Sequence, residues 1–118
     1  MIRVYVAGPY SGDTITTLGN IRRGIGTSVK LLLRGYWPYC PWLDWLYGLF
    51  AEVPIALYQA NGIAWLKVSQ AMLVLEGWEN STGTKAEIEV AKREGIPVFY
   101  TIEAFVRWAE NERWKEGA

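Results

Sequence analysis

Short apolar runs and longer amphipathic segments alternate along the chain. A short apolar run with few charges is typical of a strand that is buried on both faces of a parallel sheet. Three runs have this character: IRVYVA (2–7), AMLVLEG (71–77) and IPVFY (96–100). The segment YWPYCP (36–41) also reads as extended, and its two prolines restrict it to the edge of a sheet.

The segments between these runs carry apolar side chains three or four positions apart, which predicts helices. Gly35 and Gly95 follow two of them, as expected of the glycine that ends a helix. The predicted helices span 13–34, 42–52, 55–68, 83–94 and 102–115, the second being short and aromatic. The core-facing stripes are predicted to be Ile15, Leu18, Ile21, Ile25, Val29 and Leu32 or Leu33 in the first helix, and Ile102, Phe105, Val106 and Trp108 or Ala109 in the last.

Strands that alternate with helices predict the α/β class, with a mostly parallel sheet of four or five strands between two layers of helices. We expect a Rossmann-like three-layer sandwich with a flavodoxin-like strand order. The length of 118 residues suits one compact domain, and the chain has no internal repeat, low-complexity stretch or linker. Residues 1–118 are therefore predicted to form a single domain.

Composition excludes several classes of function. Twelve basic and twelve acidic residues give a formal net charge of zero, which argues against binding to a nucleic acid polymer. The sequence has no histidine and one cysteine, Cys40, so neither a metal site nor a cofactor is expected. It also has no long apolar stretch and no signal-peptide pattern, so we expect a cytoplasmic protein without a membrane partner.

Seven Trp and seven Tyr are many for a chain of this length. These rings could belong to the core, with a few exposed. They could equally form a subunit interface or a wall on which a nucleobase stacks, because Trp and Tyr are enriched at such surfaces.

Two loops rich in small and hydroxyl residues follow the first two buried strands: AGPYSGDT (7–14) and GWENSTGT (77–84). Neither contains a P-loop or dinucleotide-binding motif. Their backbone N–H groups can approach an anionic ligand. Ser81, Thr82 and Thr84 can cap the helix that follows, and Ser81 can also hold a phosphate or a sugar hydroxyl.

Glu87 lies in the first turns of the helix that follows the second loop. Glu87 and Glu89 point about 200° apart on a helix, so only one of them can face a site at the end of the sheet. The apolar residues around Glu87 predict a broadly buried helix: Ala86, Ile88, Val90 and Ala91. An inward-facing carboxylate would be unfavourable there unless it had a function.

The ordered motifs resemble the nucleoside 2-deoxyribosyltransferase superfamily, which includes the 2′-deoxynucleoside 5′-monophosphate N-glycosidases. The resemblance is closest to short phage and bacterial members and covers nearly the whole chain except 42–60. It rests on VYVAGPYSG (4–12), Asn20, GYWPYCP (35–41), Trp65, AMLVLEGWENSTG (71–83), Ala86, Glu87, Ala91, Gly95 and Pro97.

The resemblance implies that Glu87 is the catalytic nucleophile, which attacks the anomeric carbon of deoxyribose and forms a covalent glycosyl-enzyme. Tyr5 matches a tyrosine that orients this carboxylate. Ser81 matches the serine that lies near the 5′-phosphate in the monophosphate hydrolases, where the transferases carry an Asp. The expected substrate-binding residues are Gly8, Pro9, Ser11, Asn20, Asn61, Trp78, Ser81 and Gly83.

The chain also departs from the family pattern. Gln70 replaces an Asp before the second buried strand, and Asn61 and Gly62 stand where relatives carry an Asp that contacts the base. The general acid is therefore unassigned, and Asp44, Glu52 and Glu76 are its candidates. Asn61 can still hydrogen-bond the edge of a base.

We expect an N-glycosidase that cleaves the base from 2′-deoxynucleoside 5′-monophosphates. The alternatives are a nucleoside 2-deoxyribosyltransferase and a non-catalytic nucleotide-binding module. In the family a neighbouring subunit closes the pocket, so the resemblance implies a homodimer or a larger homo-oligomer. The aromatic segment 42–52 and the C-terminal helix are the candidates for an interface or a lid.

Overall fold

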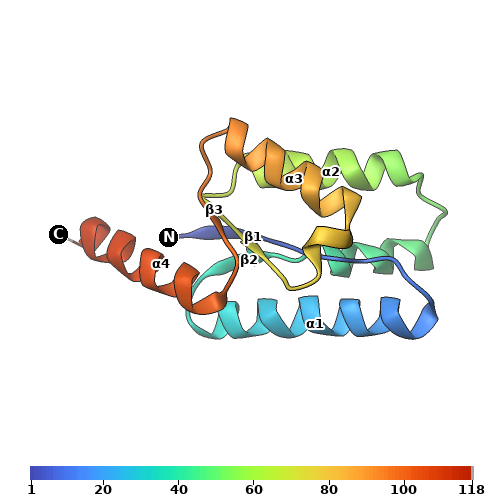
Figure 1. Ribbon diagram of the computed structural model, residues 1–118, viewed down its shortest axis with the longest axis horizontal. Helices are drawn as coiled ribbons and strands as arrows, with labels where there is room; N and C mark the ends of the chain where they lie inside the picture. Colours follow the sequence, from blue (N-terminus) through green and yellow to red (C-terminus); the bar gives the residue numbers. More distant parts are fainter. Residues whose placement is uncertain (118) are drawn as a thin grey trace.

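The computed structural model describes residues 1–117, which form one α/β domain (Figure 1). The elements follow in the order β1 (Arg3–Ala7), α1 (Thr14–Leu33), β2 (Trp37–Tyr39), η1 (Pro41–Leu49), α2 (Ile55–Lys67), β3 (Ala71–Val74), η2 (Trp78–Asn80), α3 (Thr82–Arg93), β4 (Val98–Phe99) and α4 (Ile102–Gly117).

The described residues form one sheet of four parallel strands in the order β2-β1-β3-β4. This order confirms the Rossmann-like, flavodoxin-like prediction, and β2 lies at the edge as its prolines require. The strands β3 and β4 are shorter than predicted, because hydrogen-bonded pairing stops at Val74 and Phe99 while the apolar run continues. The carboxyl ends of β1 and β3 lie together, since Ala7 pairs with Val74.

Alternation along β1 divides the core into two layers. Val4 and Val6 face α1 and α4, whereas Tyr5 and Ala7 face α2 and α3. All four residues are almost fully buried. The period of two therefore places the Tyr5 side chain on the same side of the sheet as the helix that carries Glu87.

The predicted core stripe of α1 was only partly right. Ile21 is buried and Ile25 packs against the core, but the other predicted residues are exposed: Ile15, Leu18, Val29, Leu32 and Leu33. The residues that α1 buries are mostly small or polar: Asn20, Ile21, Gly24, Ser28 and Leu31. Close approach of another element selects small residues on this face, and the apolar stripe beside it has no cover within the described chain.

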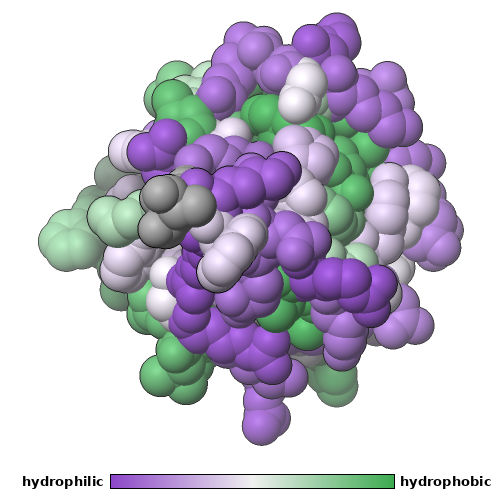
Figure 2. Space-filling model, turned by 90° about the vertical axis from the view of Figure 1, so that its left-hand side faces the viewer, coloured by the Kyte–Doolittle hydropathy of each residue, from purple (hydrophilic) through white to green (hydrophobic). Residues whose placement is uncertain are grey.

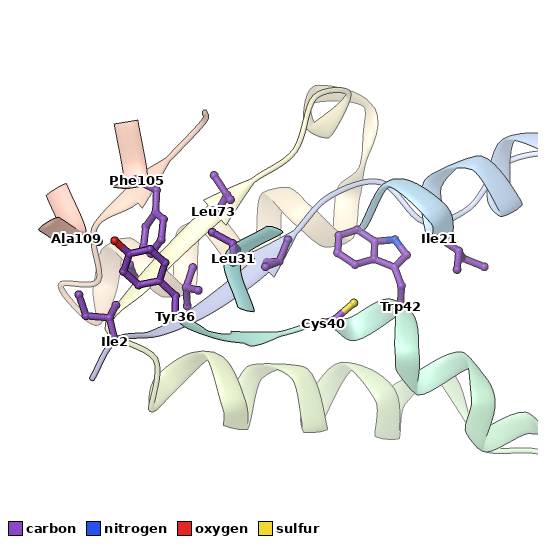
Figure 3. Packing of buried hydrophobic residues seen from close by; sticks show 12 residues of the cluster. Ile2, Ile21, Leu31, Tyr36, Cys40, Trp42, Leu73, Phe105 and Ala109 are labelled. Carbon is purple, nitrogen blue, oxygen red and sulfur yellow. The ribbon is translucent and has the colours of Figure 1, made fainter. Parts of the chain in front are cut away.

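The Trp42 side chain is the group that approaches α1 so closely. Its side chain is 2 % exposed, and its ring points from η1 toward the side of the sheet that α1 covers (Figure 3). A Cβ atom built on Gly24 would overlap the six-membered ring of Trp42. Residues 42–52 were predicted as a short amphipathic helix, but the chain forms the 3₁₀ helix Pro41–Leu49 instead, which buries only Trp42.

Figure 3 also shows how α4 attaches at the other end of the same layer. Phe105 and Ala109 are fully buried, and Phe105 packs edge-on against Tyr36 at 5.2 Å between ring centroids. Arg113 lies over the Tyr36 ring, 4.0 Å from its centroid. The predicted apolar stripe of this helix is confirmed, since Ile102, Val106 and Trp108 pack against the same cluster.

The contact between Gly24 and Trp42 can be tested with two substitutions on one helix. We expect Gly24→Ala to lower the free energy of unfolding by about 2 kcal/mol or more, because its methyl group has no space beside the Trp42 ring. Gly26→Ala is the control, because a Cβ there meets no atom within 4 Å. It should stabilise the helix by up to about 1 kcal/mol. Urea unfolding of both variants measures this, and equal stabilities would contradict the packing described.

Candidate functional site

A small pocket lies at the carboxyl ends of β1 and β3, which is where parallel α/β sheets bind ligands. Its volume is about 140 Å³, which is below the range of about 300 to 1,000 Å³ that is usual for pockets enclosing a drug-sized ligand. Three segments far apart in the sequence form its walls, which are lined by Ala7, Gly8, Tyr10, Pro41, Trp42, Ser81, Gly83, Thr84 and Glu87.

Glu87, which lines this pocket, is joined to Tyr5 by a hydrogen bond. The hydroxyl of Tyr5, on β1, donates to Oε2 of Glu87, on α3. Burial raises the pKa of Glu87 from 4.5 to about 7, although the hydrogen bond from Tyr5 lowers it. Burial and the nearby Glu87 carboxylate raise the pKa of Tyr5, so its hydroxyl stays a donor. The pair is thus a carboxylate that can change charge near neutral pH beside a phenol that cannot.

The direction of Glu87 follows from the buried stripe of α3. Thr84, Ile88 and Ala91 are buried at spacings of four and three residues, and Glu87 is half-buried at the edge of this stripe. Glu89 points to solvent, as the spacing predicted. The helix is less broadly buried than predicted, because Ala86 is exposed and Val90 is only half-buried.

Ser81 caps α3 and lines the pocket at the same time. Its hydroxyl oxygen accepts hydrogen bonds from the backbone N–H of Thr84 at 3.2 Å and from the Thr84 hydroxyl at 2.8 Å. Gly83 lines the pocket next to it. The start of α3 therefore presents small residues and the positive end of a helix dipole toward the pocket, which suits an anion.

The first loop is held against the pocket by side-chain contacts. The Trp42 indole N–H donates to the Pro9 carbonyl at 3.3 Å. Asn20 donates from Nδ2 to the Tyr10 carbonyl at 3.3 Å, and Arg23 bonds both to Asn20 Oδ1 and to the Glu76 carbonyl. The buried Asn20 and Arg23 together thus link the first loop to the chain just after β3, which gives Asn20 a structural role beside its predicted substrate-binding role.

Five of the residues that we expected to bind substrate lie outside the pocket lining: Pro9, Ser11, Asn20, Asn61 and Trp78. Ser11 is exposed in the first loop. Trp78 is half-buried in η2 and packs against Tyr100, 5.3 Å away between ring centroids. Asn61 donates from Nδ2 to the Tyr39 hydroxyl at 2.8 Å. Their contacts with a substrate stay predictions.

Sequence reasoning missed several parts of the site. Trp42 and Pro41 form a wall of the pocket, and Tyr10 belongs to it as well. Gly62 lies beside Tyr5 and Glu87: a Cβ there would be 2.8 Å from the Tyr5 hydroxyl and 4.0 Å from Glu87 Oε2. A glycine inside a predicted helix was the signal for this close approach, since glycine lowers helix stability without a packing reason.

The fold and the pocket define a Rossmann-like α/β domain with a half-buried carboxylate at the carboxyl ends of its parallel strands. The chain belongs to the DUF7768 family, a domain of unknown function, whose family model matches residues 2–101. The match contains all four described strands and α3, while α4 lies beyond it. None of the curated proteins compared with the chain matches it.

Residues 1–117 lack two kinds of feature. No cluster of three or more His, Cys, Asp or Glu side chains suited to a metal ion occurs among them. None of the helices that they form is both long enough and apolar enough to cross a bilayer.

The charge of Glu87 should be visible in the pH dependence of stability. The folded pKa of about 7 lies above the value of 4.5 for an unperturbed carboxyl. The contribution of Glu87 to stability is therefore complete below pH 4.5 and is lost as the pH rises through 7. Glu87→Gln cannot ionise. Its free energy of unfolding relative to wild type should therefore rise by up to about 3 kcal/mol as the pH increases from 4.5 through 7. Urea unfolding of both proteins at pH 4.5 and 8 measures this, and parallel pH profiles would contradict it.

Proposed function

We propose that this protein is an N-glycosidase that cleaves the bond between base and deoxyribose in 2′-deoxynucleoside 5′-monophosphates. The observation that carries the proposal is the Glu87 carboxylate, half-buried in the pocket and hydrogen-bonded by Tyr5. The resemblance of the ordered motifs to the nucleoside 2-deoxyribosyltransferase superfamily gives this carboxylate a chemistry. The placement of Ser81 in the same pocket supports a phosphorylated substrate.

In the proposed reaction the ionised Glu87 attacks the anomeric carbon, the bond from this carbon to the base nitrogen breaks, and its electron pair leaves with the base. The base takes up a proton from solvent, and a glycosyl ester of Glu87 remains. Water then attacks the same carbon and loses one proton to solvent, which releases deoxyribose 5-phosphate and restores the carboxylate. The Tyr5 hydroxyl holds one carboxylate oxygen, which leaves the other free to attack.

The dimensions of the pocket fit a sugar better than a whole nucleotide. At about 140 Å³ it has room for roughly five waters at their liquid volume. We infer that the deoxyribose enters the pocket, with its 5′-phosphate toward Ser81, Gly83 and the start of α3. The base then stays outside the pocket, near Tyr10 and Pro41, which also line it.

The test is release of free base from a panel of the four deoxynucleoside monophosphates, followed by chromatography. Wild type should release at least one base, with a rate that rises as the pH passes through 7 and Glu87 ionises. Glu87→Ala should reduce the rate of base release roughly a thousandfold or more. Glu89→Ala is the matched control, because this glutamate lies on the same helix and faces solvent. It should retain wild-type activity.

The same experiment separates the alternatives. Formation of a new nucleoside when a second base is added would assign a transferase instead. Intact nucleotides, together with thermal stabilisation of the protein by them, would assign a non-catalytic nucleotide-binding module. Equal loss in the Glu87→Ala and Glu89→Ala variants would exclude Glu87 as the nucleophile.

We also propose that two copies of the chain associate through the segment 43–57, which begins beside the pocket wall. Its large apolar side chains are about half to nine-tenths exposed: Leu43, Trp45, Leu46, Tyr47, Leu49, Phe50, Ile55 and Leu57. They expose on the order of 1,000 Å², which exceeds the largest patch of a typical monomer and matches one side of a standard interface. Asp44 and Glu52 are its only charged residues.

The position of this segment supports the proposal. It lies at the carboxyl end of the strands, on the right in Figure 1. The opposite end of the molecule, which faces the viewer in Figure 2, is mostly hydrophilic. An apolar surface with little charge can pack against the same surface of a second copy, which suits a symmetric pair of identical chains.

The oligomeric state tests this surface. Wild type should elute as a dimer or a larger assembly in size-exclusion chromatography with light scattering, and Leu49→Glu with Phe50→Glu should give a monomer. Both side chains are more than three-quarters exposed, so the fold should tolerate the change. Trp114→Glu is the control, because Trp114 is 78 % exposed on α4. If only Trp114→Glu dissociated the assembly, the interface would lie on the C-terminal helix instead. A monomeric wild type would exclude the proposed association.

A further inference from the structure

We propose that Asp44 is a positioning residue: with Asn61 it fixes Tyr39, which in turn holds Tyr5 in its hydrogen bond with Glu87 and so favours the ionised carboxylate. The part of this proposal that concerns activity rests on the proposed function. The part that concerns the charge of Glu87 does not.

Tyr39 is held by two hydrogen bonds from different elements. Its hydroxyl donates to Oδ2 of Asp44 at 2.8 Å and accepts from Nδ2 of Asn61 at 2.8 Å. Tyr39 ends β2, Asp44 belongs to η1 and Asn61 to α2. The three side chains are half-buried, so these bonds are partly shielded from water. The hydroxyl has both a donor and an acceptor partner, which fixes the plane of the ring.

The fixed Tyr39 ring supports Tyr5. It stacks on the Tyr5 ring with 5.4 Å between centroids and 17° between planes. The Tyr39 ring also stacks on Trp65, at 5.8 Å between centroids and the same angle. Gly62 leaves the space that the Tyr5 hydroxyl occupies, because a Cβ there would lie 2.8 Å from it. Tyr5 therefore has a ring on one face and a close backbone near its hydroxyl, which leaves it one direction, toward Glu87.

The geometry distinguishes Asp44 from the other carboxylates considered from the sequence. Glu52 and Glu76 are exposed, and no side-chain hydrogen bond links either one to the site. Asp44 lies one 3₁₀ turn after Pro41, which lines the pocket, and in such a helix positions three apart lie above one another. Its charge also raises the pKa of Tyr5, Tyr10 and Tyr39.

The groups around Glu87 determine whether its pKa should rise or fall when Asp44 is replaced. Tyr5 approaches from β1, with Tyr39 of β2 and Asp44 of η1 behind it, while α2 contributes the uncharged Gly62 and Asn61. The bond from Tyr5 lowers the pKa of Glu87, so its misalignment should raise that pKa. Removal of the Asp44 charge without movement of Tyr5 should do the opposite, because a nearby negative charge disfavours an ionised carboxylate.

The test is the titration of Glu87 by ¹³C NMR in protein labelled at the glutamate side-chain carboxyl, with the signal assigned by its loss in Glu87→Gln. We expect Asp44→Asn and Tyr39→Phe to raise the pKa of Glu87 by about one unit, which at pH 7 reduces the ionised fraction about fivefold. Tyr39→Phe keeps the ring and removes both hydrogen bonds. Glu52→Gln is the control for charge alone and should leave the titration unchanged.

A lower or unchanged pKa in Asp44→Asn would overturn the proposal, and so would a wild-type titration in Tyr39→Phe. Circular dichroism and thermal melts establish that each variant is folded. Where wild type releases base, kcat of both variants should fall about fivefold at pH 7 and recover at higher pH, with KM little changed. A purely structural defect would lower kcat at every pH. Where wild type releases no base, the proposed function fails and the NMR titration still decides the role of Asp44.

Discussion

The packing of Trp42 against two glycines is the constraint on which the site depends. Its indole ring occupies the space that a side chain at Gly24 would need, and it also lies 3.3 Å from where a Cβ of Gly8 would be. The same ring donates to the Pro9 carbonyl. One buried residue thus joins α1, the start of η1 and the first loop. It sets the path of the chain after β2 and brings Pro41 to the pocket that Glu87 lines.

A second constraint is electrostatic. A carboxylate buried without partners becomes neutral, and a carboxylate in water is a weak nucleophile for lack of direction. Glu87 lies between these limits, because burial raises its pKa to about 7 while one directed hydrogen bond from Tyr5 opposes the rise. The donor is itself buried in a stack of three aromatic rings. The aromatic content that seemed to divide between core and interface therefore has a third use, which is to orient a phenol.

The fold could be predicted from the sequence because it follows local patterns. The apolar runs gave β1 and β3, the prolines placed β2 at an edge, and Glu87 and Glu89 were correctly assigned to different faces of α3. The buried face of α1 could not be predicted, since apolar periodicity favours Leu18 over Gly24 and the tryptophan that selects the glycine lies 18 residues further along the chain. The contacts of Asp44 and Gly62 were hidden for the same reason, because each depends on a partner from another strand or helix.

The pocket and the exposed apolar segment are parts of one continuous piece of chain. Residues 41 and 42 line the pocket, and the exposed side chains begin at Leu43. In the proposed reaction, a pocket of about 140 Å³ would leave the nucleobase outside its walls, where water would compete for Glu87 and weaken every electrostatic contact. A second copy on the segment 43–57 would exclude that water without any new element in the chain. The short 3₁₀ helix, which buries only Trp42, then has a physical reason: it turns one side chain inward to build the wall and leaves the others free to pack against a partner.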